Sequence, residues 1–215
     1  MKFDAVRFQD KLGREVILRS AEESDADALI EYLKITAAET PYLVREPDEI
    51  TITHEQEVNL IRNKANADGE LLLIAVIDGE HAGNCSLMNI APCRRYRHRC
   101  GIAAALYQKY CGCGIGKQMM ETVLEAAKKA GYEQAELEVV SGNRNAIALY
   151  RKLGSRKIRH IPGQYEISGR YICKYRLDDE EVISCPSPVS RQKRSRNSVL
   201  CSFFHTPKPK RACRK

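Results

Sequence analysis

Three glycines stand within five residues near the middle of this 215-residue chain, in the segment Cys-Gly-Cys-Gly-Ile-Gly-Lys at residues 111–117. Glycine has no Cβ, so such a loop can turn tightly and let a ligand approach its backbone. An amphipathic pattern predicts a helix from Ile115 to Ala130, whose unpaired N–H groups and positive dipole end point back at the loop. The segment therefore predicts an anion site, most naturally for a phosphate.

Two nucleotide-binding motifs fit this loop poorly. A nucleotide P-loop has Ser or Thr after its lysine to bind magnesium, whereas Gln118 follows Lys117. A dinucleotide fingerprint spaces its glycines as Gly-x-Gly-x-x-Gly, whereas these occupy every second position. Glu136 or Glu138 nevertheless lies near the distance at which that motif places its acidic residue. A simple glycine turn is a further alternative.

The elements that must position this loop follow from hydrophobic periodicity. Asp78-Gly79 predicts a hairpin turn between two apolar runs. A chain of this length can bury one sizeable core, and we expect one domain over residues 1–178. The predicted strands cover residues 15–18, 71–77, 81–90, 101–107, 135–140, 156–161 and 170–177, and the predicted helices cover residues 24–38, 53–66, 115–130 and 143–153.

The positive charge of the chain is concentrated at one end. Residues 186–215 contain nine basic and no acidic residues, which exceeds the net charge of +7 by two and leaves −2 for residues 1–185. Residues 179–215 show neither helical nor strand periodicity, and we expect a basic, disordered extension. A nucleic-acid partner is expected only through this extension, and a solvated tail without function is the alternative.

The nine cysteines do not form the pattern of a disulfide framework or a metal site. Their number is odd and the first residues lack the apolar core of a signal peptide, so we expect reduced thiols in a cytoplasmic protein. No apolar run is long enough for a membrane span. The residues His98, Cys100, Cys111 and Cys113 lack the paired spacing of structural zinc sites, and no metal is expected.

A second segment, Asn-Arg-Asn-Ala-Ile-Ala-Leu-Tyr-Arg-Lys-Leu-Gly at residues 143–154, follows a predicted strand directly. It resembles the second signature block of the GNAT superfamily of N-acetyltransferases, Asn-x-x-Ala-Ile-x-Leu-Tyr-x-Lys-x-Gly-Phe. Residues 111–116 resemble the first block, Arg/Gln-x-x-Gly-x-Gly/Ala, and the element order over residues 15–177 is also similar. The chain departs from the family at Cys111, where Arg or Gln is usual, and at Ser155, where Phe is usual.

This resemblance implies a mixed α/β fold of the α+β type. Its central sheet would be mostly antiparallel, with about seven strands flanked by about four helices and a splayed parallel strand pair at the cofactor site. The implied cosubstrate is acetyl-CoA, whose thioester carbonyl would be polarised by the N–H near Leu106. The implied cofactor-binding residues are Ala105, Leu106 and Tyr107 for the pantetheine arm, Gly112, Cys113, Gly114, Ile115, Gly116 and Lys117 for the pyrophosphate, and Asn143.

The resemblance also implies an acetyl transfer by direct attack of a primary amine, carried by a small molecule or a peptide. Tyr150 matches the position that protonates the departing thiolate. Glu138 and His98 are candidate general bases, although either can be a surface group and a water chain can replace both. A homodimer is an open alternative.

Residues 34–55 and 161–170 are expected to select the acceptor, with Tyr42, Tyr165 and Glu166 as candidate lining residues. Two other functions remain open on the sequence alone. One is a CoA-binding or regulatory module of the same fold without turnover. The other is a nucleic-acid binder that acts through its basic tail.

Overall fold

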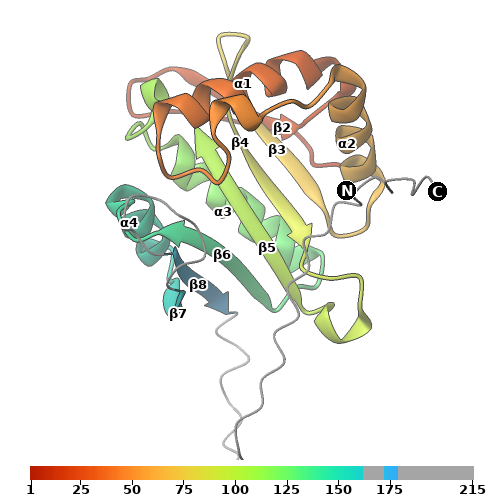
Figure 1. Ribbon diagram of the computed structural model, residues 1–215, viewed down its shortest axis with the longest axis vertical. Helices are drawn as coiled ribbons and strands as arrows, with labels where there is room; N and C mark the ends of the chain where they lie inside the picture. The colour runs from red at the N-terminus through yellow and green to blue at the C-terminus, as the bar shows by residue number, and fades with distance from the viewer. Residues whose placement is uncertain (162–171, 179–215) are drawn as a thin grey trace, which may run out of the picture. The chain divides into compact units, whose positions relative to one another are not determined.

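The computed structural model describes residues 1–161 and 172–178, which contain one eight-stranded sheet (Figure 1). Its strands are β1 (Val6–Gln9), β2 (Glu15–Ser20), β3 (Leu71–Ile77), β4 (Glu80–Asn89), β5 (Arg99–Leu106), β6 (Gln134–Val140), β7 (Arg156–Ile161) and β8 (Ile172–Asp178). They are ordered β1-β2-β3-β4-β5-β6-β8-β7, and every neighbouring pair is antiparallel except β5–β6. The predicted mixed, mostly antiparallel sheet with one parallel pair is confirmed.

Four α-helices lie on this sheet: α1 (Ala26–Glu39), α2 (His54–Asn66), α3 (Ile115–Lys129) and α4 (Arg144–Lys152). Figure 1 shows α1 and α2 in front of the sheet and α3 behind it. Leu72 and Ile74 of β3 pack with α1 and α2, whereas Leu71 and Leu73 belong to the main core with α3. β3 is therefore covered on both faces, which explains its continuous apolar run.

The parallel strands β5 and β6 pair over three residues only. Their register joins Arg99 to Gln134, Cys100 to Ala135 and Gly101 to Glu136. Residues 102–106 of β5 have no partner on β6, and Figure 1 shows the two strands diverging from their paired end. This divergence is the predicted splay, and it leaves one edge of β5 without a neighbouring strand.

A buried ion pair closes the narrow end of the splay. Glu136 of β6 is 3% exposed, and its Oε1 accepts a hydrogen bond of 2.6 Å from Arg99 Nε of β5. Arg176 of β8 lies 3.6 Å from the same oxygen. Three adjacent strands thus share one carboxylate at the point where the parallel ladder ends.

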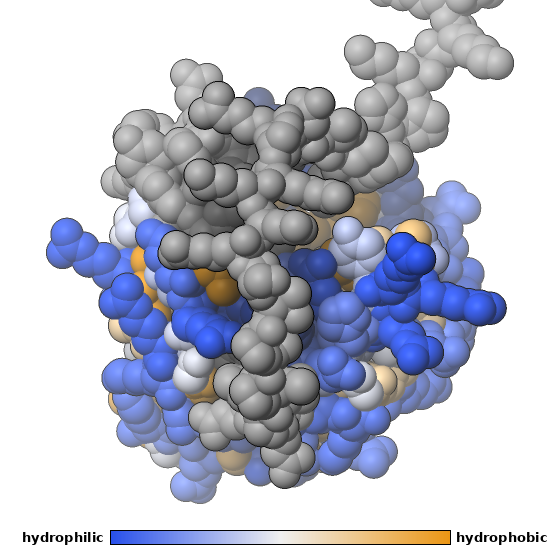
Figure 2. Space-filling view, turned by 90° about the horizontal axis from the view of Figure 1, so that it is seen from below, coloured by the Kyte–Doolittle hydropathy of each residue, from blue (hydrophilic) through white to orange (hydrophobic). Residues whose placement is uncertain are grey.

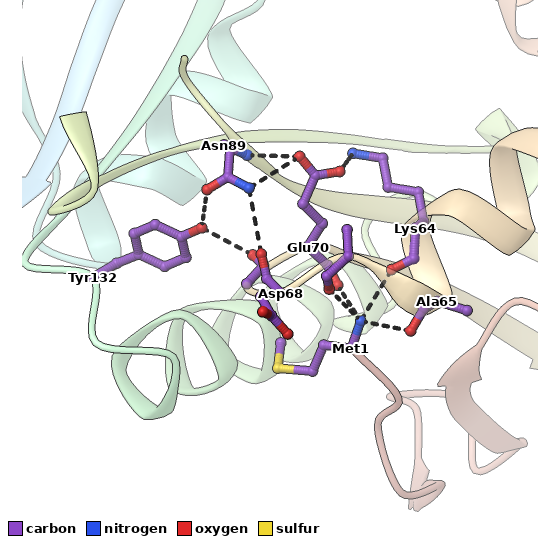
Figure 3. Close-up of polar contacts among 9 residues, drawn as sticks. Met1, Lys64, Ala65, Asp68, Glu70, Asn89 and Tyr132 are labelled. Atoms are coloured by element: carbon purple, nitrogen blue, oxygen red, sulfur yellow. Dashed lines mark hydrogen bonds and ion pairs between the residues drawn. The ribbon is translucent and has the colours of Figure 1, made fainter. Parts of the chain in front are cut away.

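Polar contacts also join the end of α2 to the end of β4 (Figure 3). The Met1 nitrogen lies 2.8–3.0 Å from four carbonyl oxygens, those of Lys64, Ala65, Ala67 and Glu70. The last carbonyls of a helix lack partners within the helix, so a cation there is favourable. Nearby, the Tyr132 hydroxyl lies 2.6 Å from Asn89 Oδ1.

Residue contacts divide the chain into two units, Met1–Ile183 and Ser184–Lys215, and all the elements above belong to the first. The expected basic extension and the expected loop residues Tyr165 and Glu166 lie outside the described residues. In the part of the chain that the structure describes, no helix is long and apolar enough to cross a membrane.

Candidate active site

The glycine loop connects the end of β5 to the start of α3, as its position in the sequence predicts. Gly112 and Gly114 have φ angles of 82° and 93°, a region that L-residues rarely adopt, and Gly114 is the N-cap residue of α3. The amides of residues 112–116 donate to no acceptor in the described part of the chain. Unpaired N–H groups at a helix start form a site suited to a phosphate.

Gly116 lets three elements approach one another beside this loop. A Cβ at this position would lie 3.3 Å from Leu106 Cδ1 of β5 and 3.7 Å from Leu149 Cδ2 of α4. The loop, the end of β5 and α4 therefore meet at Gly116. Lys117, the last residue of the motif, is exposed, and its Nζ lies 3.1 Å from Glu121 Oε1.

The two cysteines of the loop are free thiols. Cys111 is exposed, and its Sγ lies 3.6 Å from the carbonyl oxygen of Tyr107. Cys113 is half-buried, and its carbonyl oxygen accepts a hydrogen bond of 3.0 Å from the Lys11 amide. The departure from the family at Cys111 thus leaves the loop anchored through its backbone.

The free edge of β5 can be assigned residue by residue from its pairing with β4. Leu106 lies opposite Gly83, and the Tyr107 amide donates to the Ala82 carbonyl at 3.1 Å. Because antiparallel pairing alternates, the N–H and C=O groups of Leu106 and Ala104 face away from β4, toward the splay. The backbone of Ala105 instead pairs with Asn84 of β4. Ala104 could not be predicted from the sequence, because only the strand register reveals its outward-facing backbone groups.

Tyr150 projects from α4 into the main core, on the sheet face that α3 covers. Burial raises its pKa to about 12, with a smaller contribution from the Cys85 thiol of β4. The Tyr150 hydroxyl has no hydrogen-bond partner among the described residues. At the start of the same helix, Asn143 Oδ1 accepts a hydrogen bond of 3.1 Å from the Ala146 amide and so caps α4.

Glu138 lies on the opposite sheet face from Tyr150. Its neighbours Leu137 and Val139 are buried in the core with α3, so the exposed Glu138 faces the side of α1 and α2. It comes two residues after Glu136, beyond the last residue that pairs with β5. The Tyr42 hydroxyl, from the segment after α1, donates to the Gly142 carbonyl at 3.1 Å just past β6.

His98 lies at the other end of the splay from the glycine loop. Its carbonyl accepts hydrogen bonds from the amides of Glu133 and Gln134, where β5 and β6 are still paired. His98 and Cys100 therefore stand at the start of β5, whereas Cys111 and Cys113 follow its end. These four residues are not brought together, and residues 1–161 and 172–178 contain no group of side chains arranged to hold a metal ion.

A cluster of three rings packs beside the end of β5, and of these residues only Tyr107 was a candidate from the sequence. Tyr32 of α1 stacks edge-on against His81 of β4 and Tyr107, with ring centroids 4.7 and 5.3 Å apart. Burial lowers the pKa of His81 to about 4 and raises that of Tyr32. No sequence motif joins Tyr32 and His81 to Tyr107, because the three residues come from separate segments of the chain.

Comparison with known proteins identifies the relatives of this fold and site. Residues 30–155 match the model of the acetyltransferase (GNAT) family. An N-alpha-acetyltransferase of Sulfurisphaera tokodaii is 26% identical over 157 residues, which cover 72% of this chain and 89% of that protein.

Solved structures share the fold at low sequence identity. A GNAT-family acetyltransferase from Streptococcus pneumoniae has a TM-score of 0.72 and 24% identity, covering 76% of this chain and 98% of that one. The structure of yncA from Salmonella typhimurium with its cofactor acetyl-CoA has a TM-score of 0.69 and 17% identity, covering 81% and 99%. A ribosomal-protein-alanine N-acetyltransferase from Brucella melitensis has a TM-score of 0.66 and 21% identity, covering 75% and 98%.

Proposed function

The chain belongs to the acetyltransferase (GNAT) family, and we propose that it transfers an acetyl group from acetyl-CoA to a primary amine by direct attack within a ternary complex. The observation that carries this proposal is the splay between β5 and β6, which ends at a loop with unpaired amides. An extended chain that carries a diphosphate would fit these two features together. The thioester supplies an activated acetyl group when the cosubstrate is bound.

The residues of this chain have separate roles in holding the cosubstrate. The amides of residues 112–116 would bind the pyrophosphate, with Lys117 adding positive charge nearby. The backbone groups of Ala104 and Leu106 would pair with the pantetheine arm, as a peptide pairs with the edge of a sheet. The Leu106 N–H is then the donor toward the thioester carbonyl.

The chemical step needs a base for the amine and a donor for the departing sulfur. Glu138 is exposed on the face of α1 and α2, from which the acceptor would approach, and we assign it as the base. Tyr150 lies on the other face, and with a pKa of about 12 it keeps its proton at neutral pH. Its hydroxyl therefore donates to the departing thiolate, and the proton released from the amine balances the one supplied.

The acceptor that the relatives favour is the amine of a peptide. One curated relative is an N-alpha-acetyltransferase, and one similar structure is a ribosomal-protein-alanine N-acetyltransferase. On the acceptor face, β5 carries only the small side chains of Ala103 and Ala105 next to the splay, which leaves room for an extended chain. We therefore rank peptide α-amines above small-molecule amines.

Thiol release from acetyl-CoA tests this proposal across a panel of acceptors. The panel should contain peptides with free N-terminal Ala, Ser or Met, the same peptides with blocked N-termini and an internal lysine, and small polyamines. We expect release with the free peptides first. Binding of acetyl-CoA without release for any amine would instead support a CoA-binding module.

The role of Glu138 is tested in the same assay by Glu138→Gln. Loss of a general base is expected to lower kcat at neutral pH by about 10²-fold while leaving acetyl-CoA affinity unchanged. Glu133→Gln is the matched control, because Glu133 is exposed just before β6, at the closed end of the splay. Equal kcat values for the two variants would reject Glu138 and favour proton transfer through water.

A further inference from the structure

The turn between β4 and β5 is a second feature with an unusual charge, separate from the acetyl-transfer site. Residues 92–100 contain four arginines and a histidine but no acidic residue. Residues 92–97 are all exposed, and their central part is the 3₁₀ helix η3 (Arg94–Tyr96). Figure 2 looks at the molecule from the end where this turn lies in Figure 1, and strongly hydrophilic side chains stand out on its right-hand side.

The charge of this turn differs from that of the surrounding chain. Residues 1–185 carry a net charge of −2, so the four arginines of the turn leave −6 for all the other residues in that range. The positive charge of this turn thus contrasts with the net negative charge of the other residues in the range 1–185. It is also separate in sequence from the basic residues of 186–215.

Three of the four arginines are available to a partner. Arg99 is occupied, because it bonds to Glu136 at 2.6 Å and its guanidinium lies 5.2 Å from the centre of the Tyr96 ring. Arg94, Arg95 and Arg97 have no ion pair and no side-chain hydrogen bond within residues 1–161 and 172–178. They are held together, because backbone bonds from Tyr96 to Cys93 and from Arg97 to Arg94 fix the turn.

The same turn carries an exposed aromatic ring. Tyr96 is 41% exposed, so part of its ring is open to solvent. Arg99 packs on one face of the ring. In the sequence the exposed ring stands directly between Arg95 and Arg97, whose guanidinium groups have no partner within residues 1–161 and 172–178.

We propose that this turn is a docking surface for a single-stranded nucleic acid. Arg94, Arg95 and Arg97 bind backbone phosphates, for which the guanidinium fork is well matched, and a base stacks on Tyr96. Unpaired arginines alone would also suit an acidic protein, but an exposed ring between Arg95 and Arg97 in the sequence favours a ligand with flat bases. The eight residues of β5 span seven steps of about 3.3 Å, so the turn lies roughly 23 Å from the glycine loop and its ligand leaves that loop accessible.

Fluorescence anisotropy with a labelled 20-nucleotide single-stranded RNA tests this proposal on the full-length chain. Arg94→Ala/Arg95→Ala/Arg97→Ala should weaken binding at least tenfold and lower the salt slope by about 2, because each phosphate contact contributes about 0.7 on single strands. The matched control is Lys2→Ala/Arg62→Ala/Lys129→Ala, which removes the same charge from exposed positions elsewhere. The control should bind as the wild type does, because its three substitutions lie outside the turn. The tail is present in every variant, so its contribution to binding cancels in the comparison.

The role of stacking is tested by Tyr96→Ala, which should weaken binding without changing the salt slope, and by Tyr96→Phe, which should retain it. Wild-type affinity in the triple arginine variant, or an equal loss in the control, would overturn the proposal. Competition by poly-glutamate as effective as that by unlabelled RNA would indicate an acidic protein partner instead. Thiol release should be unchanged in all these variants, so failure here is distinct from failure of the proposed acetyl transfer.

Discussion

At the scale of single residues, Tyr150 combines deep burial with an unused hydroxyl. Tyr150→Phe retains the ring and removes only the donor, so we expect kcat to fall about 10²-fold with little change in acetyl-CoA affinity or melting temperature. With a pKa of about 12, the phenol also stays protonated up to about pH 10, and the rate should show no alkaline loss from this group below that pH. Thiol release and calorimetric titration measure these quantities.

The control for this variant is Tyr132→Phe. The Tyr132 hydroxyl lies 2.6 Å from Asn89 Oδ1, at the end of β4 away from the glycine loop (Figure 3). Its loss should reduce stability by about 1 kcal/mol without changing kcat. A kcat of wild-type size in Tyr150→Phe would show that the ring acts only through packing.

His81 predicts an acid dependence of stability. Burial lowers its pKa from 6.5 to about 4, so the unfolded chain binds a proton between these values while the folded chain does not. The contribution of the neutral His81 to the free energy of unfolding is fully present above pH 6.5, and it is lost as the pH falls toward 4. A tenfold difference in proton affinity between the folded and unfolded chains corresponds to about 1.4 kcal/mol, and allowing for the partial exposure of the residue we expect a loss of about 2 kcal/mol.

The comparison variant is His81→Phe, which keeps a ring against Tyr32 and Tyr107 and removes the titration. Urea unfolding at pH 7.0 and pH 4.5 should then show a smaller acid loss than in the wild type. The same loss in both proteins would assign the acid sensitivity to other groups.

The position of the glycine loop between a strand and a helix could be predicted from the sequence, because it depends on local spacing. The glycine loop at the end of a strand needs only neighbours in sequence to be recognised. Ala104 and the His81–Tyr32 contact could not be predicted in this way, because both depend on strand register and on residues far apart in the chain. His98 was a weaker candidate for the same reason, since only the fold separates the two ends of β5.

At the scale of elements, the backbone conformation of the glycine loop can be tested by Gly114→Ala. Gly114 has a φ of 93°, so a Cβ would strain the loop by about 1 kcal/mol or shift it. We expect acetyl-CoA affinity to fall about tenfold, which corresponds to about 1.4 kcal/mol. Calorimetric titration measures the affinity directly.

Gly131→Ala is the matched control for this substitution. Gly131 follows α3 with a φ of 84° and has open space around it, so the strain is similar but lies at the other end of the helix. Both variants should lose similar thermal stability, and only Gly114→Ala should lose affinity. Equal affinity in the two would indicate that the loop amides do not bind the diphosphate.

The closed end of the splay gives a second prediction at this scale. Glu136→Gln leaves Arg99 and Arg176 beside a neutral amide in a buried site, and loss of a buried charge partner costs about 3 kcal/mol. Urea unfolding should show this loss. In Glu15→Gln, which breaks an exposed ion pair with Arg7, the change should stay below about 0.5 kcal/mol.

The order of elements was largely predictable, because helices α1 to α4 and most strands have clear periodicity or long apolar runs. β1 was missed and the sheet has eight strands instead of about seven, since Val-Arg-Phe-Gln is short, half polar and mostly exposed. β5 begins at Arg99 and not at Gly101, because Arg99 joins the sheet through the buried Glu136. The charged Arg99 thus concealed the start of the strand, which hydrophobicity alone does not mark.

At the scale of the whole molecule, the residues assigned above to cosubstrate binding and to proton transfer all lie in the described part of the chain. All of these residues fall within the unit Met1–Ile183, whereas the nine basic residues of 186–215 fall in the other unit. Removing residues 184–215 changes the net charge from +7 to −2. This removal takes away no residue that the structure shows in a hydrogen bond or an ion pair with the sheet.

We therefore expect a chain that ends at Ile183 to fold, to bind acetyl-CoA and to release thiol at the rate of the full-length protein. Its melting temperature should change by no more than about 2 °C, because surface charges far from buried pairs contribute little to stability. Its affinity for single-stranded RNA should fall with the loss of nine charges, yet the triple arginine variant should still bind more weakly than its parent. Loss of the thermal shift with acetyl-CoA in the shortened chain would show that the site needs residues 184–215, and the predicted single domain over residues 1–178 would then be too short.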